Sequence, residues 1–344
     1  MRIIIADIKG NEGYLMKDTV VGGYGARLVP FSRVTAAYSY VKRAFITIPS
    51  VQMAYLAAIA ERRGHEVVFT QGKQVEGDVA LVLSSLVDYR GEIAWADAAR
   101  RRGIRVGFVG LAASKMPHLF AEHADFLIQG EPESAMLQMA AGKRLEGLVE
   151  SPALPDLDVL PFPRWDLMGD YRGFWYGFSK LMGGNGFPVM ASRSCPEFCT
   201  YCPHRILAAY RARTVKSIIG EIEWLCDRYS FPNVIFRDPL FTEKRDRCLE
   251  LCDEIRSRNL KIRFEFETRL DRLDDELLKE FHGVGLRAIN FGVESVSPET
   301  LRKVGRRPIP EAHQRAIIDS CKRRGIETVG FYVFGFLQDD WNSI

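Results

Sequence analysis

Short apolar runs alternate with helix-like stretches along almost all 344 residues of the chain. Apolar runs of this kind are typical of strands that are buried on both faces, and such strands form parallel sheets covered by helices. In the first half the expected strands are Arg2–Ala6, Val67–Thr70, Val79–Leu83, Arg105–Val109 and Phe126–Ile128, and the expected helices are Val51–Arg63, Glu92–Arg102, Met116–Glu122 and Glu133–Ala141. The sequence therefore predicts an α/β protein that begins with a doubly wound parallel sheet. The irregular stretch Asn11–Thr47 carries no prediction.

The alternation is interrupted by four prolines between Ser151 and Arg164. Proline restricts its own backbone and that of the residue before it, so this segment is expected to be a stiff, extended connector. It divides the chain into an α/β domain over residues 1–150, a linker and docking segment over 151–180, and a second domain over 181–344. In the second domain the expected strands are Phe187–Ala191, Asn233–Arg237, Ile262–Glu267, Ala288–Val293 and Thr328–Phe334, and the helices between them are Lys216–Arg228, Lys244–Arg258, Asp274–Val284 and Glu311–Arg324.

Three of the seven cysteines lie in one short loop, as Cys195, Cys199 and Cys202. A cubane iron–sulfur cluster is normally held by four thiolates, so three thiolates leave one iron open for a substrate or cofactor. Zinc is the alternative, but it prefers four ligands, and the nearby candidates for the fourth are His204 and the more distant Cys226. The cysteines outside the loop lie at apolar positions of helical patterns, where a free cysteine packs as a small hydrophobic residue.

The surroundings of the cysteine loop are informative too. The apolar run Phe187–Ala191 precedes it, a helical stretch with basic residues follows it, and Tyr201 stands directly before the last cysteine. In this arrangement the loop closely resembles that of the radical S-adenosylmethionine (radical SAM) superfamily. The resemblance implies a [4Fe-4S] cluster on the three cysteines, with SAM bound to the open iron through its amino and carboxylate groups. It also implies a partial (β/α) barrel of six strand–helix units, of which five are present, so the barrel is expected to be incomplete at the C-terminus.

The resemblance continues at the ends of the later strands. The residues that it implies in SAM binding are Tyr201, Asp238, Glu267, Glu294, Ser295 and Gly335. Asp238 corresponds to a residue near the SAM amino group, and the motif of Glu294 and Ser295 approaches the ribose. Gly335 belongs to the segment that binds adenine. The family usually continues there with Pro-Gly-Glu, whereas this chain has Gln338-Asp339-Asp340.

The first half resembles the cobalamin-binding domain that precedes this core in one large subgroup of the superfamily. The matching stretches include Pro49–Ala58, Gly64–Val67 and Ala124–Glu133. The resemblance implies cobalamin contacts from Ser84, Leu86, Gly110, Gly130 and Glu131. Proteins that bind cobalt through a histidine carry a DxHxxG motif, but the comparable stretch Asp7–Gly10 has no histidine. Cobalamin would therefore bind without a histidine from this loop. The alternative is that the domain binds no cobalamin.

The resemblance implies an enzyme that cleaves SAM reductively at the cluster and abstracts hydrogen from a carbon substrate. Cobalamin-dependent C-methylation is the first expectation, and radical oxidative cyclisation or rearrangement without methyl transfer is the alternative. From other classes, an iron–sulfur electron carrier would need a fourth thiolate, and a cobalamin-binding sensor would need no cluster. Methylthiolating relatives carry a second cysteine triplet in their N-terminal domain, whereas residues 1–194 contain no cysteine.

The expected partners are a small-molecule or lipid-like substrate and a one-electron reductant such as flavodoxin or ferredoxin. A net charge of +3 is too small to indicate nucleic acid, and basic clusters such as Arg100–Arg102 precede a glycine, as helix ends do. The sequence contains no apolar run of about 18 residues, so no membrane span is expected, and the cytoplasm is the expected location. Phe174, Trp175, Tyr176 and Phe178 either line an apolar substrate site or dock the domains together.

Overall fold

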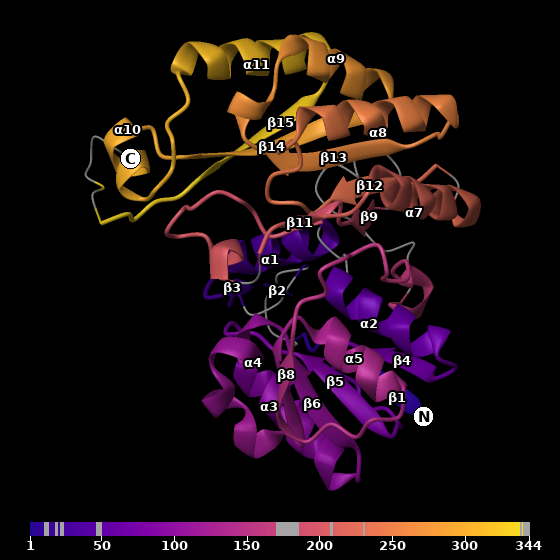
Figure 1. Cartoon of the computed structure of the whole chain (residues 1–344). Helices are drawn as coiled ribbons and strands as arrows, with labels where there is room; N and C mark the ends of the chain where they lie inside the picture. Colours follow the sequence, from indigo (N-terminus) through magenta and orange to yellow (C-terminus); the bar gives the residue numbers. More distant parts are fainter. Residues whose placement is uncertain are drawn as a thin grey trace. The chain divides into compact units, whose positions relative to one another are not determined.

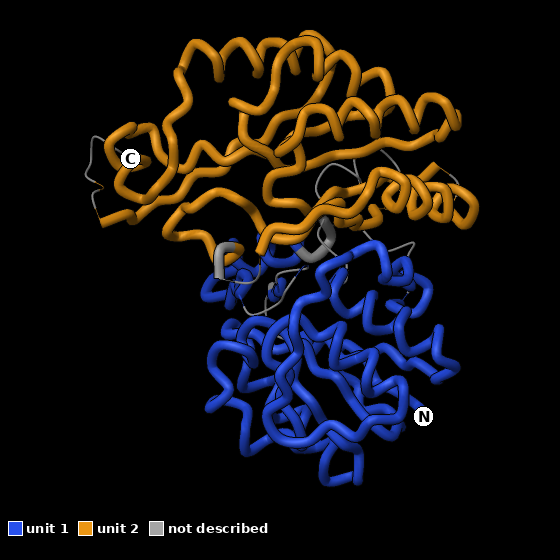
Figure 2. The backbone as a smooth tube through the Cα atoms, viewed as in Figure 1, with its two compact units in different colours: residues 1–180 blue, residues 181–344 orange. Residues whose placement is uncertain are grey.

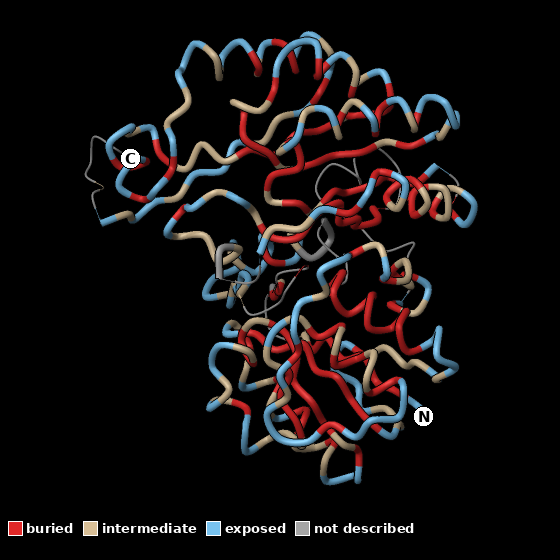
Figure 3. The backbone as a smooth tube through the Cα atoms, viewed as in Figure 1, coloured by how far each residue is buried: buried red, intermediate tan, exposed pale blue. Residues whose placement is uncertain are grey.

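The computed structural model describes residues 1–9, 14–17, 20, 24–45, 50–169, 186–206, 209–229, 231–337 and 339. The chain divides into two compact units, Met1–Lys180 and Leu181–Ile344 (Figure 2). Each unit has its own sheets and its own buried core (Figure 3). The aromatic residues at 174–178 lie outside the described residues. In the part of the chain that is described, no helix has the length and apolarity needed to cross a membrane.

Unit 1 is built on six parallel strands in the order β4-β1-β5-β6-β7-β8. They are β1 (Arg2–Ala6), β4 (Glu66–Thr70), β5 (Val79–Leu83), β6 (Arg105–Val109), β7 (Phe126–Gly130) and β8 (Gly147–Ser151). Helices α2 (Val51–Arg62) and α5 (Pro132–Ala140) cover one face, and α3 (Tyr89–Arg101) and α4 (Leu111–Lys115) cover the other (Figure 1). This confirms the doubly wound sheet. The strand order reverses between β1 and β5, and sheets of this kind bind ligands at the carboxyl ends of the strands at such a point.

Successive residues of these strands pack on opposite faces of the sheet. Ile4 and Phe108 belong to the cluster that includes Trp95 of α3. Ile3 and Ile5 point to the opposite face and are just as deeply buried. Because both faces are covered, the strands read as unbroken apolar runs, which is why the sequence revealed them.

Parts of unit 1 differ from the prediction. The expected helix Met116–Glu122 is wrong, because α4 ends at Lys115 and two short 3₁₀ turns follow, Pro117–Leu119 and Ala121–His123. Pro117 lacks an amide hydrogen and is tolerated only in the first turn of a helix. Strand β8 was not expected. The stretch without a prediction contains the hairpin of β2 (Tyr14–Lys17) and β3 (Gly25–Leu28) and the helix α1 (Arg33–Phe45).

Unit 2 contains five parallel strands in the order β15-β14-β13-β12-β9. They are β9 (Gly186–Val189), β12 (Asn233–Phe236), β13 (Arg263–Thr268), β14 (Leu286–Glu294) and β15 (Glu327–Tyr332). The helices are α7 (Val215–Arg228), α8 (Arg245–Ser257), α9 (Asp275–Gly283), α10 (Pro298–Lys303) and α11 (Glu311–Arg323). Figure 1 shows α8, α9 and α11 along one side of this sheet. These strands stand side by side in chain order, as in a partial (β/α) barrel. Helix α10 was not expected.

An aromatic cluster fixes which face of this sheet is free for a site. Phe264 and Phe266 of β13 pack with Phe241 and Phe281, and the rings of Phe266 and Phe281 are 5.1 Å apart. Because Phe281 belongs to α9, these phenylalanines face the helix layer. Side chains alternate along a strand, so Glu265 and Glu267 must point to the opposite, inner face.

Candidate cluster and cofactor site

The three cysteines lie in the loop that follows β9, at the carboxyl end of the sheet of unit 2. The first part of this loop is anchored by Asp238, whose buried carboxylate accepts hydrogen bonds from the amide of Ala191, at 3.0 Å, and from the hydroxyl of Ser192. Ser194 has a positive φ of 64°, and its hydroxyl donates to the carbonyl of His204 at 2.9 Å. These bonds tie both ends of the cysteine loop to the sheet and to each other.

The three cysteines line one cavity, which has a volume of about 750 Å³ counted to its open mouth. The opposite wall consists of residues at the carboxyl ends of β13 and β14. Of the predicted SAM-binding residues, the cavity brings together Tyr201, Glu267 and Glu294. The remaining lining residues are Glu197, His204, Pro239, Leu240, Thr268, Arg269, Asn290, Phe291, Gly292, Arg306 and Phe331.

The three cysteine thiols share one cavity. Among the described residues, no group of three or more His, Cys, Asp or Glu side chains is placed to hold a single metal ion. In a cubane cluster, by contrast, each thiolate binds a different iron, and the ligands surround a body of several atoms. Cys199 is buried, while Cys195 and Cys202 are half-buried. Three thiols around one cavity therefore fit a [4Fe-4S] cluster with an open iron.

Burial shifts the pKa of titratable groups that line the cavity. Burial raises the pKa of Cys195 to about 11, so bound iron would supply the positive charge that its thiolate needs. Burial also raises the pKa of Tyr201, whose hydroxyl lies within hydrogen-bonding reach of Cys199 and Glu294. Burial raises the pKa of Glu294 despite the opposing charge of Arg306. Tyr201 thus links the cysteine loop to the end of β14.

Three residues that the resemblance implied in SAM binding do not line the cavity, namely Asp238, Ser295 and Gly335. Asp238 is fully buried under the start of the cysteine loop. The hydroxyl of Ser295 accepts a hydrogen bond from the amide of Ser297 at 3.1 Å, at the start of α10. The amide of Gly335 donates to the carboxylate of Asp339 at 2.8 Å. Each therefore has a hydrogen bond within the chain, and its role in SAM binding stays a prediction.

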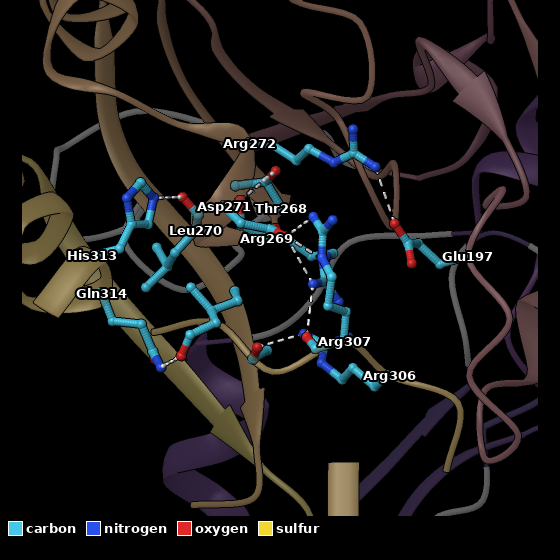
Figure 4. A network of polar contacts seen from close by, with 12 residues as sticks. Glu197, Thr268, Arg269, Leu270, Asp271, Arg272, Arg306, Arg307, His313 and Gln314 are labelled. Carbon is cyan, nitrogen blue, oxygen red and sulfur yellow. Dashed lines mark hydrogen bonds and ion pairs between the residues drawn. The ribbon is translucent and has the colours of Figure 1, made fainter. Parts of the chain in front are cut away.

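Two arginines were missed by the sequence analysis. Arg269 directly follows β13 and is only 3% exposed, and its Nη1 has no hydrogen-bond partner within the described part of the chain. Its other terminal nitrogen binds Asp271 and the carbonyl of Arg307, as Figure 4 shows. A strand end followed by a basic residue could have revealed Arg269. Arg306 follows α10, far from any motif, so only the folded structure reveals it.

Polar contacts join the cavity wall to the cysteine loop. Arg272 donates to the carboxylate of Glu197 at 3.1 Å (Figure 4). Arg237 donates to Glu267 at 2.9 Å, which orients that carboxylate at the end of β13. Arg269 and Arg306 line this wall. Guanidinium groups bind carboxylates well, so the wall suits an anionic group of this kind.

The residues predicted to contact cobalamin lie at the carboxyl edge of the sheet in unit 1. Leu86 is 48% exposed, although it is a large apolar residue. Gly110 has a φ of 97° and begins α4. Gly130 also has a positive φ, and a side chain there would collide with the carbonyl of Ser151 in β8, so the fold itself requires this glycine. Glu131 precedes α5, and its carbonyl accepts a hydrogen bond from Ser151.

Ser84 has a structural role as well. It is fully buried, its hydroxyl donates to the carbonyl of Val109 at 2.7 Å, and it accepts a hydrogen bond from the amide of Ala113 at 2.9 Å. These bonds connect β5, β6 and α4. Leu86 and Gly130 are the predicted residues that are exposed, whereas Gly110 is buried.

A buried lysine at the same edge was not foreseen. Lys17 of the β2–β3 hairpin is 4% exposed, and its Nζ donates to the carbonyl of Leu83 at 2.9 Å. The same Nζ lies 2.9 Å from Glu92 and 3.5 Å from Asp7. Burial raises the pKa of Glu92, and the charge of Lys17 opposes this shift. The hairpin is therefore fixed to the carboxyl ends of β1 and β5 by an ion-pair network.

Comparison with known proteins places these features in a family. Residues 189–342 match the radical SAM superfamily. A methyltransferase of Pyrococcus horikoshii, PH0819, which is described as uncharacterised, is 24% identical over 62% of this chain and 49% of its own length. The anaerobic magnesium-protoporphyrin IX monomethyl ester cyclase of Rubrivivax gelatinosus is 27% identical over 61% of this chain and 41% of its own length. The chain thus spans less than half the length of these curated relatives.

A solved structure covers both units. TsrM of Kitasatospora setae, a radical SAM methyltransferase solved with cobalamin and a [4Fe-4S] cluster, has a TM-score of 0.64 and 17% identity, over 83% of this chain and 64% of its own. At this identity the likeness shows the fold. The cysteine loop, the partial barrel and the match over residues 189–342 agree, and unit 2 is therefore similar to the radical SAM superfamily.

Proposed function

We propose that this protein is a radical SAM enzyme that uses cobalamin to methylate a carbon atom of a small molecule. When bound, a reduced [4Fe-4S] cluster supplies the electron that cleaves the sulfonium of SAM, and cobalamin supplies a carrier for the methyl group. The observation that carries the proposal is the single cavity that brings Cys195, Cys199 and Cys202 opposite the ends of β13 and β14. The protein's own task is to bind, orient and shield these groups.

The cavity residues divide this task between them. The three thiolates hold the cluster and leave one corner open. Glu267 and Glu294 accept hydrogen bonds from the ribose or the ammonium of SAM, and the guanidinium of Arg269 donates to its carboxylate. Phe291, which is buried, and Phe331 contribute apolar surface to the cavity.

Unit 1 is the proposed cobalamin domain. Its fold is shared with TsrM, and its strand order reverses between β1 and β5, where such sheets bind ligands. Leu86 is exposed at the end of β5, and Gly130 is exposed at the end of β7. No histidine occurs among residues 1–64, so the cobalt would have no histidine ligand from the β1 loop.

Methylation is proposed ahead of cyclisation because the relatives include several named methyltransferases, such as PH0819. The relative from Rubrivivax gelatinosus is a cyclase, so radical cyclisation without methyl transfer is the second candidate. In either case the reaction needs an external one-electron donor such as flavodoxin or ferredoxin. For both candidate reactions we propose that the protein works in the cytoplasm.

The first experiment tests the cluster. The full chain is reconstituted anaerobically with iron and sulfide, reduced, and given SAM, and 5′-deoxyadenosine is measured. We expect the wild-type chain to form 5′-deoxyadenosine and Cys199→Ala to form at least about a hundredfold less. Cys226→Ala should behave like wild type, because Cys226 lies on α7, outside the cavity. A wild-type chain that binds zinc, or a cluster whose electron paramagnetic resonance does not respond to SAM, would refute the proposal.

The second experiment tests cobalamin separately. Protein purified with the vitamin supplied should show a cobalamin absorption spectrum. Leu86→Asp should weaken binding about tenfold or more, because it puts a charge against an apolar part of the ligand. Leu148→Asp is the matched control, since Leu148 is a comparably exposed leucine of unit 1 on β8, at the edge of the sheet. Equal cobalamin content in all three proteins would exclude Leu86 from the site, and no cobalamin in any would exclude the cofactor.

A further inference from the structure

The segment that follows α10 packs directly on the cysteine loop, although about a hundred residues separate the two in sequence. The amide of Thr200 donates to the carbonyl of Val304 at 2.9 Å, and the hydroxyl of Thr200 lies 3.4 Å from the same oxygen. Gly305 has a φ of 73°, and a Cβ there would lie 2.6 Å from the carbonyl of Phe198. The two backbones therefore approach so closely that only glycine fits at residue 305.

This contact places Arg306 inside the cavity. Arg306 is only 9% exposed, and its Nη1 lies 3.9 Å from the Sγ of Cys199. Its Nη2 donates to the carbonyl of Gly292 at 2.5 Å and lies 3.7 Å from the carboxylate of Glu294. The guanidinium is thus held between the end of β14 and one cysteine, and Figure 4 labels it beside its neighbour Arg307.

A fixed positive charge at this place has a definite effect on a cluster. Guanidinium groups stay protonated at every pH at which a protein is folded. Reduction adds one negative charge to the cluster, and hydrogen bonds to the sulfurs and nearby charge set the reduction potential. A guanidinium that donates toward a cysteine sulfur stabilises the reduced form more than the oxidised form, so it raises the potential.

We propose that Arg306 is a positioning residue of the cluster that raises its reduction potential through Cys199. The inference rests on the proposed function, because it needs a cluster on the three cysteines. It deepens that function by naming the side chain that makes electron uptake by the cluster easier. Arg306 touches the cysteine and not the reacting carbon, so its effect appears first in the potential.

The test is a redox titration of the full chain after anaerobic reconstitution. The reduced cluster is monitored by electron paramagnetic resonance, without SAM. We expect Arg306→Gln to lower the midpoint potential and Arg306→Lys to keep part of the wild-type value, because lysine retains the charge. Arg307→Gln is the matched control, since Arg307 is adjacent to Arg306 and carries the same charge. Its side chain is 72% exposed and pairs with Asp271. This control should leave the potential unchanged.

The possible outcomes separate this inference from the proposed function. A wild-type chain that holds no cluster would sink both. A wild-type chain that forms 5′-deoxyadenosine, beside an Arg306→Gln variant with full iron content and an unshifted potential, would overturn the inference alone. If Arg306→Gln holds no iron, the inference is tested with Arg306→Lys. The inference then requires the midpoint potential of Arg306→Lys to lie below that of wild type. If neither variant holds iron while circular dichroism shows an intact fold, Arg306 acts in assembly and the tuning role is refuted.

Discussion

Glu265 carries a carboxyl group in the interior of unit 2. It is 2% exposed, and neither of its oxygens has a hydrogen-bond partner within the described residues. Burial raises its pKa to about 8, opposed by the charge of Arg237. At neutral pH the side chain is therefore mostly a neutral acid on the inner face of β13. Its ionisation in the folded state opposes folding, because a buried charge without a partner is costly.

This pKa shift predicts a pH-dependent stability of unit 2. Between about pH 4.5 and about pH 8 the folded state keeps the proton of Glu265, which the unfolded chain has released. The contribution of Glu265 to the free energy of unfolding is therefore largest below about pH 4.5. It falls by about 1.4 kcal/mol per pH unit up to about pH 8 and is lost above that. Glu265→Gln should remove this fall and raise the free energy of unfolding at about pH 9, measured by urea denaturation. Glu276→Gln is the control, because Glu276 is exposed. Equal pH profiles for wild type and Glu265→Gln would contradict the prediction.

The sequence revealed residues whose role depends on local spacing and missed those whose role depends on folding. Cys195, Cys199 and Cys202 could be found because one loop carries them all. Glu267 and Glu294 could be found because they end strands. Arg306 could not, since its place beside Cys199 depends on the contact of residues 304–306 with a loop about a hundred positions earlier. Asp238 was placed at the right end of the right strand, but burial makes its carboxylate an anchor for the cysteine loop.

At the scale of elements, burial decided what the sequence could reveal. Strands such as β5 are buried on both faces and read as unbroken apolar runs. The hairpin β2–β3 and helix α1 have no such signal, because most described side chains of β3 and α1 are exposed. The described strand residues of the hairpin include two buried ones, Leu15 and Lys17, and two positions are too few to give a periodic pattern.

The Lys17 network predicts that this hairpin depends on one charge. Lys17→Met should destabilise unit 1 by about 3–5 kcal/mol, because Glu92 would stay buried without its cation and Asp7 would keep only Lys9, at 3.9 Å. Hydrogen exchange should show the loss of protection first in the hairpin. Adding Glu92→Gln should recover part of the stability, since it removes one of the stranded charges. Lys143→Met is the control, because its partner Gln138 lies at an exposed contact. An unchanged unfolding midpoint for Lys17→Met would show that the network contributes little.

At the scale of the whole molecule, the two units have separate sheets and separate cores, so each should unfold as its own cooperative unit. Differential scanning calorimetry of the full chain should therefore resolve two transitions. Lys17→Met should lower only the transition of unit 1, which the proposed cobalamin would raise. Glu265→Gln should change the pH dependence of only the transition of unit 2, which the proposed cluster would raise. The two variants thus assign the transitions without separating the domains. If both variants shift one common transition by the same amount, the units fold as one and the cofactors must stabilise the chain together.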